Sequence, residues 1–356
     1  MPPVASQPVE GALTRSAIFL TLVLNRDTSA LEAFRGICAD LSSLVKAVGF
    51  RSAEAGLTCV MGIGADLWDR LEMGARPAGL HPFMEIAGVH RAPATPGDVL
   101  LHIRASRPDY CFELASQIMR RLSAFATVAD ETQGFKYFDN RDLLGFVDGT
   151  ENPVGIPLSE AVLIGEEDGN FAGGSYVIVQ KYLHDLQKWE AMTVESQERV
   201  IGRQKLSDIE FPDEKKASFA HNVLTNIEDD AGNQLEILRD NMPFGSPGRG
   251  EFGTYFIGYA REPGRIETML RNMFVGKPPG NYDRILDVST AVTGGLFFVP
   301  TGDVLDMIGA GDTITAPATA SATAPSTAPA TAPAGVTQPA ARRDGSLGLG
   351  SLKQGN

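Results

Sequence analysis

The sequence has few cysteines, few histidines and no long apolar run. Its three cysteines, Cys38, Cys59 and Cys111, lack Cys-x-x-Cys spacing, so neither a disulfide framework nor a zinc site is indicated. We expect them to be buried thiols. No segment approaches the roughly 18 apolar residues of a membrane span. The apolar run 17–24 follows only Arg15 and precedes no small-residue cleavage site, which favours a strand over a signal peptide. We therefore expect a cytoplasmic protein without membrane attachment.

Positive charge is also scarce. Lysine and arginine number 31 against 44 aspartates and glutamates, which gives a net charge of −13 and a pI near 4.9. Binding to nucleic acid requires a basic face, so we expect no nucleic-acid partner. The hydrophobic share of 43% is ordinary for a soluble globular protein, and 356 residues can form one large or two smaller domains.

Strand-like and helix-like segments alternate along the chain. In the first half we predict strands at 16–24, 57–63, 98–103 and 126–130, and helices at 29–48, 65–71 and 110–125. Asp27 or Thr28 is expected to cap the first long helix. In the second half we predict strands at 174–182, 253–260 and 296–299, and helices at 184–193, 196–203 and 263–274. Two strand–helix–strand units in succession are typical of a ferredoxin-like module.

We therefore predict an α+β protein of two ferredoxin-like modules, with antiparallel sheets and peripheral helices, of the dimeric α+β barrel type. The expected parts are a flexible arm, an N-terminal module, a C-terminal module, an Ala/Thr/Pro-rich linker and a terminal peptide, at 1–14, 15–150, 151–312, 313–341 and 342–356. The linker has no charged residue and cannot form a core, so we expect it to be semi-extended.

The terminal peptide carries leucines in a Gly/Ser frame. In an extended chain Leu347 and Leu349 face the same side, which suits binding to an apolar groove. A low-complexity end without a partner is the alternative. This end resembles the targeting peptide that loads cargo into encapsulin shells. The resemblance implies an encapsulin shell protein as a partner through residues 344–356, and a location inside an encapsulin compartment in the cytoplasm.

One carboxylate stands among glycines in the run Gly145-Phe146-Val147-Asp148-Gly149-Thr150-Glu151-Asn152-Pro153. This stretch is too rich in Gly and Pro for a helix or a central strand. Its glycines allow a tight turn and a close approach to a flat ligand, so Asp148 can point into a cavity.

A second unusual run is Arg239-Asp240-Asn241-Met242-Pro243-Phe244-Gly245. It cannot continue a helix or a central strand, so we expect a shaped turn. Arg239 and Asn241 are two residues apart and can project to one side. On composition alone, Arg239 could instead belong to a surface ion pair.

The five histidines are His81, His90, His102, His184 and His221. None forms a His-x-x-x-His or His-Glu-x-x-His pair, so a metal site with several histidines is poorly supported. A haem iron needs only one proximal histidine. From the residues alone, each histidine is more often structural than a ligand.

Together these segments resemble a known family. The run 145–149 resembles the GxxDG signature of the dye-decolorising peroxidases, which bind haem and react with hydrogen peroxide. The run 239–245 resembles the RDNMPFG segment of the B-type members, and His221 matches the position of the proximal ligand. The strand at 253–260 resembles the haem-wall strand of the family. The resemblance covers roughly residues 12–312.

The resemblance implies one haem b per chain, with His221 as the iron ligand. It places Asp148, Arg239 and Asn241 on the distal face as catalytic residues. It further implies that Gly149, Thr150, Glu151, Phe256 and Arg203 contact the cofactor. Asp287 is our first choice for the carboxylate partner of the proximal histidine, and Asp283 is the alternative.

The implied activity is oxidation of aromatic donors, such as dyes and phenols, or of Mn(II), by hydrogen peroxide through a ferryl intermediate. A distal carboxylate can move a proton between the peroxide oxygens, and a guanidinium can stabilise the charge that develops. The alternatives are an enzyme that removes iron from haem and a haem-storage cargo protein. A homo-oligomer is expected.

Overall fold

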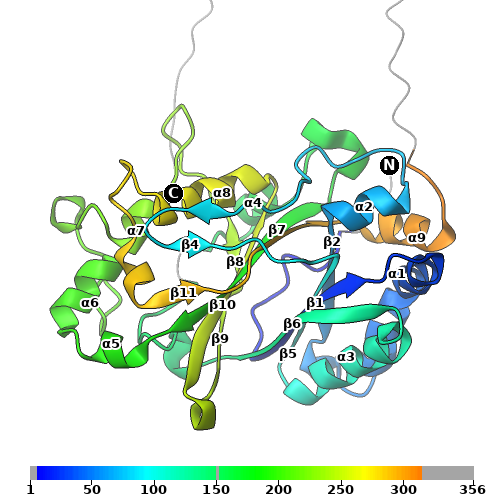
Figure 1. Ribbon diagram of the computed structural model, residues 1–356, viewed down its shortest axis with the longest axis horizontal. Coiled ribbons are helices and arrows are strands. Elements are labelled where there is room, and N and C mark those ends of the chain that lie inside the picture. The colour runs from blue at the N-terminus through cyan, green and yellow to red at the C-terminus, as the bar shows by residue number, and fades with distance from the viewer. Residues whose placement is uncertain (1–5, 150–151, 315–356) are drawn as a thin grey trace, which may run out of the picture. The chain divides into compact units, whose positions relative to one another are not determined.

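The computed structural model describes residues 6–149 and 152–314 (Figure 1). The thirteen-residue terminal peptide at 344–356 and almost all of the linker therefore lie outside the described residues. The described part contains one antiparallel sheet of ten strands and one small hairpin. Along the main path the sheet order is β6-β1-β5-β2-β12-β7-β10-β8.

The strands of the first half are β1 (Ser16–Leu24), β2 (Thr58–Gly64), β5 (Val99–Ala105) and β6 (Ala126–Phe135). Those of the second half are β7 (Ser175–His184), β8 (Leu238–Arg239), β9 (Met242–Ser246), β10 (Glu251–Ala260), β11 (Ser289–Ala291) and β12 (Gly295–Val299). The hairpin consists of β3 (Ile86–Ala87) and β4 (Arg91–Ala92). In both halves the fourth main strand lies beside the first, and the third lies between the first and the second. This is ferredoxin-like topology, so the predicted fold class is confirmed.

The two halves share a continuous sheet. β12 pairs with β2 through Phe297 opposite Gly64 and Phe298 opposite Ile63. A Cβ at Gly62 would lie only 2.8 Å from the Cβ of Phe297, so glycine permits the close approach of the strands here. The described residues thus belong to one compact unit, and the predicted division at residue 150 stays a prediction.

Helices cover the outer faces of the sheet (Figure 1). They are α1 (Thr28–Gly49), α2 (Ala65–Leu71), α3 (Pro108–Leu122), α4 (Ile156–Val162), α5 (Leu186–Glu190), α6 (Val194–Ile201), α7 (His221–Leu224), α8 (Pro263–Phe274) and α9 (Gly302–Ala310). Asp27 caps α1, because its Oδ1 accepts a hydrogen bond of 2.9 Å from the backbone nitrogen of Ala30. No described helix is both long enough and apolar enough to cross a membrane.

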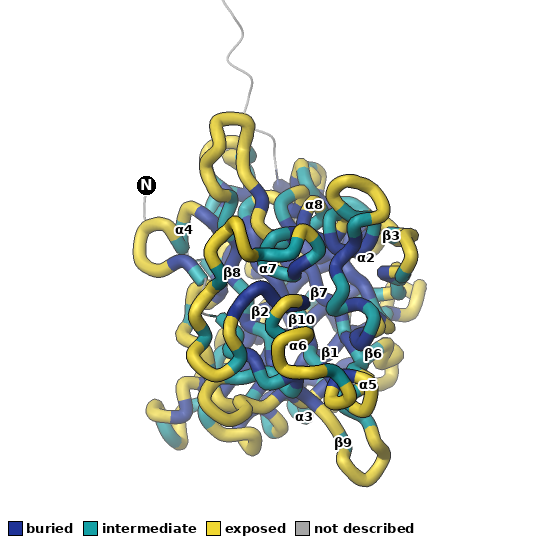
Figure 2. The backbone as a smooth tube through the Cα atoms, turned by 90° about the vertical axis from the view of Figure 1, so that its left-hand side faces the viewer, coloured by how far each residue is buried: buried dark blue, intermediate teal, exposed yellow. Residues whose placement is uncertain are grey.

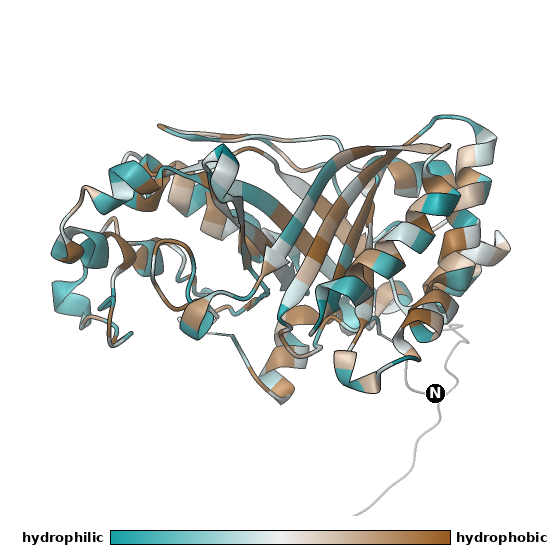
Figure 3. Ribbon diagram, turned by 90° about the horizontal axis from the view of Figure 1, so that it is seen from below, coloured by the Kyte–Doolittle hydropathy of each residue, from teal (hydrophilic) through white to brown (hydrophobic). Residues whose placement is uncertain are grey.

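Strand β1 is apolar and buried on both of its faces. Its Ile18, Leu20 and Leu22 pack in the core formed with the helices. The alternate residue Phe19 faces a second core between the halves, where its ring stacks on Tyr255 of β10 at 4.1 Å between centroids. A strand buried on both sides reads as a continuous apolar run. Figures 2 and 3 show the buried, hydrophobic strands at the centre and the exposed loops around them.

Four expectations need correction. The helix predicted from His184 is wrong at its start, because His184 ends β7 and Asp185 then caps the short α5. The shaped turn expected at 239–245 is wrong in its second part, because Met242–Ser246 form β9 and pair with β10. Helix α9 was not predicted. The described part of the expected flexible arm is anchored: the buried side chain of Gln7 bonds to the backbone of Met61 and Pro300 at 2.7–2.9 Å. The three cysteines are free and buried, as expected.

Candidate active site

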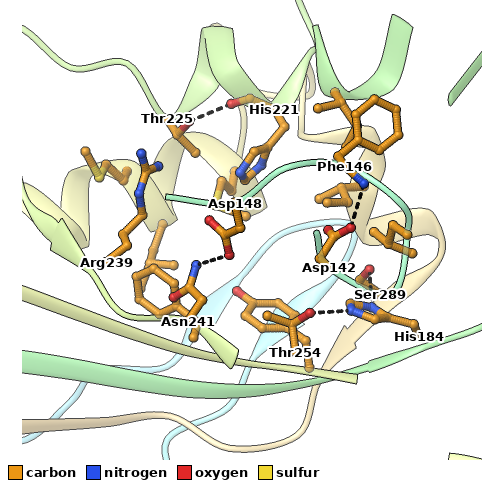
Figure 4. Close-up of a pocket in the computed structure, with 18 of the residues that line it drawn as sticks. Asp142, Phe146, Asp148, His184, His221, Thr225, Arg239, Asn241, Thr254 and Ser289 are labelled. Atoms are coloured by element: carbon orange, nitrogen blue, oxygen red, sulfur yellow. Dashed lines mark hydrogen bonds between the residues drawn. The ribbon is translucent and has the colours of Figure 1, made fainter. Parts of the chain in front are cut away.

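The loop that carries Asp148 is held in shape by its own backbone. The nitrogen of Asp148 donates to the carbonyl of Asn140 at 2.9 Å, and Arg141 and Val147 form an antiparallel bridge. Gly149 follows with a φ of 81°, a conformation that favours glycine. The loop therefore presents the Asp148 side chain to the cavity beside it, as Figure 4 shows.

Asn152 connects this loop to the second motif. Its side-chain nitrogen donates to the carbonyl of Arg239 at 2.7 Å, and its side-chain oxygen accepts from the nitrogen of Arg239 at 3.0 Å. This reciprocal pair fixes the backbone of Arg239 relative to the Asp148 loop. Sequence reasoning missed the role of Asn152. The only signal for it was its place in the Gly-rich run.

Asn241 orients the Asp148 carboxylate. Its Nδ2 donates to Asp148 Oδ2 at 3.0 Å, while its Oδ1 accepts from the nitrogen of Ile257 in β10 at 3.1 Å. The strand backbone thus settles which end of the amide faces Asp148. Arg239 and Asn241 line the same cavity, as predicted from their spacing (Figure 4).

Asp240, between these two residues, turns into the interior of the protein. Its Oδ2 accepts from Nη1 of Arg104 in β5 at 2.6 Å, and the side chains of Arg104 and Asp240 are 0% and 2% exposed. Burial raises the pKa of Asp240, and the charge of Arg104 opposes this shift. The ion pair ties the motif to the first half of the chain.

His221 faces the cavity from the first residue of α7. Its Nδ1 lies 2.6 Å from Oδ2 of Asp283, whose side chain is fully buried. Because an ionised carboxylate can only accept hydrogen bonds, His221 Nδ1 carries the proton, and the lone pair of Nε2 is available to a metal. Burial alone would lower the pKa of His221, but the charge and hydrogen bond of Asp283 outweigh it and raise the pKa.

The first choice for this carboxylate, Asp287, was therefore wrong, and the alternative Asp283 holds the position. Asp283 is the N-terminal cap of the short turn Arg284–Asp287, and Asp287 is the last residue of this turn. Asp287 points elsewhere, since its Oδ1 lies 2.9 Å from His90 Nε2 and 2.9 Å from the hydroxyl of Tyr282.

The rest of the cavity wall is mostly apolar. Helix α8 contributes Ile266, Met269, Leu270 and Met273, and β10 contributes Phe256. A second and a third cavity adjoin the first, and all three share Val147, Asp148 and Arg239 in their walls. This space, lined by the imidazole of His221 together with the polar trio Asp148, Arg239 and Asn241, suits a large flat ring whose metal takes one histidine ligand. Within the described ranges, no group of three His, Cys, Asp or Glu residues could hold a bare metal ion.

The remaining predicted contacts fall around these cavities. Phe256 lines the first cavity, Gly149 the second and third, and Arg203 the third. Arg203 Nη1 is 3.0 Å from Asp208 Oδ1, and Nη2 is 3.4 Å from Glu210 Oε2. Thr150 and Glu151 lie outside the described residues.

Two titratable residues in the wall were not predicted as site residues. Burial raises the pKa of Asp142 to about 7, and the charge of Asp148 acts in the same direction. Burial lowers the pKa of His184 to about 4, and its ring bonds to Ser289 and Thr254 at 2.8 Å each. His184 is therefore neutral at physiological pH. Figure 4 shows both residues on the side of the cavity away from Arg239.

Comparison with known proteins agrees with this geometry. Residues 7–136 match the family described as Dyp-type peroxidase, N-terminal, and residues 139–304 match Dyp-type peroxidase, C-terminal. The chain belongs to the Dyp-type peroxidase family. As a member of this family, it is a peroxidase.

Relatives of this Dyp-type peroxidase have been named and solved. A dye-decolorizing peroxidase of Rhodococcus erythropolis is 53% identical over 99% of this chain and 98% of its own. A DypB variant of Rhodococcus jostii in complex with heme has a TM-score of 0.83 and 53% identity over 85% of this chain and 98% of its own. The encapsulated DyP-type peroxidase of Mycobacterium smegmatis has a TM-score of 0.82 and 56% identity over 85% of this chain and 97% of its own.

Proposed function

We propose that this peroxidase binds one haem b per chain in the described cavity and uses hydrogen peroxide to oxidise aromatic donors. The observation that carries the proposal is the placement of His221, backed by buried Asp283, in the same apolar cavity as Asp148, Arg239 and Asn241. Bound haem supplies the iron that reduces peroxide and accepts electrons from the donor.

The three polar residues have different roles in proton transfer and charge stabilisation. Asp148 takes the proton from one peroxide oxygen and returns it to the other, because Asn241 holds its carboxylate toward the cavity at 3.0 Å. Arg239 is permanently charged and stabilises the negative charge that develops as the O–O bond breaks. Asn241 is thus a positioning residue for Asp148.

His221 would ligate the iron through Nε2. The Asp283 hydrogen bond at Nδ1 fixes the ring and makes it a stronger electron donor. Arg203 would hold a negatively charged edge of the ring, and the backbone at Gly149 and the ring of Phe256 would border its faces. A homo-oligomer remains a prediction.

The test is single-turnover mixing of the haem-loaded protein with hydrogen peroxide, followed by absorption. Asp148→Ala and Arg239→Leu should each slow the first spectral change by about 100-fold or more while haem remains bound. Matched surface controls are Asp66→Ala and Arg120→Leu, whose side chains are 63% and 68% exposed. If both cavity variants react at the parent rate, the distal assignment is wrong. His221→Ala should lose the haem or change its Soret band.

Two activities were alternatives from the sequence: removal of iron from haem, and haem storage without turnover. Storage does not require the oriented carboxylate–amide pair or the guanidinium described above. Product analysis without peroxide would reveal iron removal as free porphyrin. Mn(II) is a second reductant to test, because another DypB variant has been solved in complex with manganese.

We further propose that residues 344–356 direct the enzyme into an encapsulin shell. The support is the leucine pattern of this segment and the encapsulated relative from Mycobacterium smegmatis. Deletion of the segment should abolish co-purification with a co-expressed shell protein while peroxidase activity stays at the parent level. Unchanged co-purification would exclude this role.

A further inference from the structure

The second cavity differs in chemistry from the first. It has a volume of about 250 Å³ and reaches from Asp148, Arg239 and Asn241 to the surface around Phe135 and Tyr137. The side chains of Phe135 and Tyr137 are 38% and 36% exposed. The cavity therefore connects the reactive groups to a mouth with exposed aromatic rings.

These rings form part of a continuous aromatic surface. The rings of Phe135 and Tyr137 are 6.3 Å apart, and those of Tyr137 and Phe138 are 4.7 Å apart, measured between centroids. Phe138 is 74% exposed and Leu13, in the opposite wall, is 50% exposed. Large exposed apolar side chains that gather at one opening mark a binding surface, and aromatic walls favour an aromatic ligand.

The charges at this mouth are positive although the chain carries a net charge of −13. Lys136 and Arg141 both line the cavity. The guanidinium of Arg141 donates only to backbone carbonyls among the described residues, at 2.6–3.1 Å, and Lys136 has no carboxylate partner there. Their charges are thus available to a ligand. Of the carboxylates in the wall, Asp240 pairs with the guanidinium of Arg104, whereas Asp148, at the inner end, accepts a hydrogen bond from the neutral amide of Asn241, which does not cancel its charge.

The inner end of the cavity offers a proton acceptor and a guanidinium. Asp148 can accept the proton of a phenol. Arg239 Nε is buried and has no hydrogen-bond partner among the described residues. A ligand that matches the whole cavity has a phenol at the inner end, a ring between the aromatic walls and an acidic group at the mouth.

We propose that this second cavity binds the reducing substrate, and that its preferred substrates are phenols with a carboxylate on the far side of the ring. The proposal rests on the peroxidase function proposed above. Each phenol gives up one electron and one proton, so two phenols reduce one hydrogen peroxide to two water molecules and leave two phenoxyl radicals. The acidic group is not consumed and serves only for recognition by Lys136 and Arg141.

The test uses three para-substituted phenols of similar size whose terminal group is anionic, neutral or cationic: 4-hydroxyphenylacetate, tyrosol and tyramine. With the haem-loaded full-length enzyme, we expect kcat/KM to fall in that order. Lys136→Glu should lower kcat/KM for the anion by about tenfold and raise it for tyramine, because one unit charge is reversed at the mouth. Lys46→Glu reverses an exposed charge away from these cavities and should change none of the three values.

The aromatic wall is tested by Phe135→Ser and Tyr137→Ser, which should raise KM for all three phenols several-fold. Phe50→Ser, at an 89% exposed position, is the control. Equilibrium binding of 4-hydroxyphenylacetate to the resting enzyme, measured calorimetrically without peroxide, should weaken in Lys136→Glu. This readout is independent of turnover.

The outcomes separate this site from the reaction itself. If the parent enzyme does not react with peroxide, the proposed function fails. If it reacts but Lys136→Glu leaves the ratio of anion to cation kcat/KM unchanged, the donor site is wrong. If only the rate of the peroxide step changes, the cavity is an entrance for peroxide. If Phe138→Ser instead lowers the molecular mass in solution, the aromatic surface is an interface between copies of this chain, which also overturns the proposal.

Discussion

Replacing Arg104 by methionine would leave the Asp240 carboxylate buried without its positive partner. The two side chains are in contact at 2.6 Å and are 0% and 2% exposed. Arg104 also donates to the carbonyl of Pro8, so the substitution loosens the N-terminal segment as well. Removal of one member of a buried ion pair costs about 3–5 kcal/mol, because the remaining charge is uncompensated.

The loss depends on pH in a defined direction. Burial already raises the pKa of Asp240, and without the charge of Arg104 the pKa rises further. The folded variant then binds a proton at pH values where the unfolded chain has lost it, so its stability falls as the pH increases. We expect a larger destabilisation at pH 8 than at pH 5.5.

Urea unfolding followed by circular dichroism measures this effect. Arg104→Met should lower the free energy of unfolding by the amount above, whereas Arg104→Met with Asp240→Leu should recover most of it, because two apolar side chains replace the pair. The control is Arg121→Met, which removes a pair to Asp40 that is equally short at 2.6 Å but 45% and 52% exposed. It should cost under about 1 kcal/mol.

A loss below about 1 kcal/mol for Arg104→Met at pH 8, or a double variant no more stable than the single one, would refute this reasoning. The same variants report on the site, because Asp240 stands between Arg239 and Asn241 in the chain. Arg104→Met should therefore also slow the first spectral change with peroxide. Arg121→Met should leave that rate unchanged.

Three further predictions follow from the same contacts. Asp283→Asn weakens the hydrogen bond to His221, so the reduction potential of the bound iron should rise in a redox titration, while Asp287→Asn should leave it unchanged. Burial raises the pKa of Asp142 from an ordinary 3.8 to about 7, so the folded protein should become less stable as the pH rises from 4 to 7. Asp142→Asn should make the melting temperature depend less on pH across that range. An unchanged pH dependence of the melting temperature in this variant would show that Asp142 is not its cause. Asn152→Ala removes both hydrogen bonds to the distal arginine backbone, so the peroxide step should slow about tenfold at unchanged haem content; a parent-like rate would show that these bonds do not position the arginine.

Much of the fold could be predicted because its signals are local. The bounds of β1, α2 and α8 agree with the prediction, since apolar periodicity, a following turn and a proline in the first helical turn act over a few residues. The end of β7 and the start of α5 were predicted wrongly. The strand and the short helix meet at Asp185, and the apolar pattern does not show where one ends and the other begins. The Gly-rich run around Asp148 was an equally local signal, whereas the expectation of a turn over 239–245 failed because Met242–Ser246 form β9 and pair with β10.

The partners of the site residues could not be predicted in this way. Asp283 precedes the four-residue turn Arg284–Asp287 and Asp287 ends it, and only the fold decides which of them meets His221, 62 residues before Asp283 in the chain. Asn152 and Arg239 are 87 residues apart, and their pairing depends on how the Asp148 loop packs beside β8.

The sequence alone predicted the ferredoxin-like order of elements and the two motifs that carry Asp148, Arg239 and Asn241, whereas His221 was singled out only by the resemblance of the chain to a known family. Apolar periodicity and turn residues act within a few positions of the chain, so the elements that they specify can be predicted from the sequence. The tertiary structure alone decided the carboxylate behind His221, the buried pair of Arg104 and Asp240, and the second cavity with its cationic mouth. These depend on strand pairing and packing between distant segments, such as those of Arg104 and Asp240, which are 136 residues apart, and no local pattern encodes them.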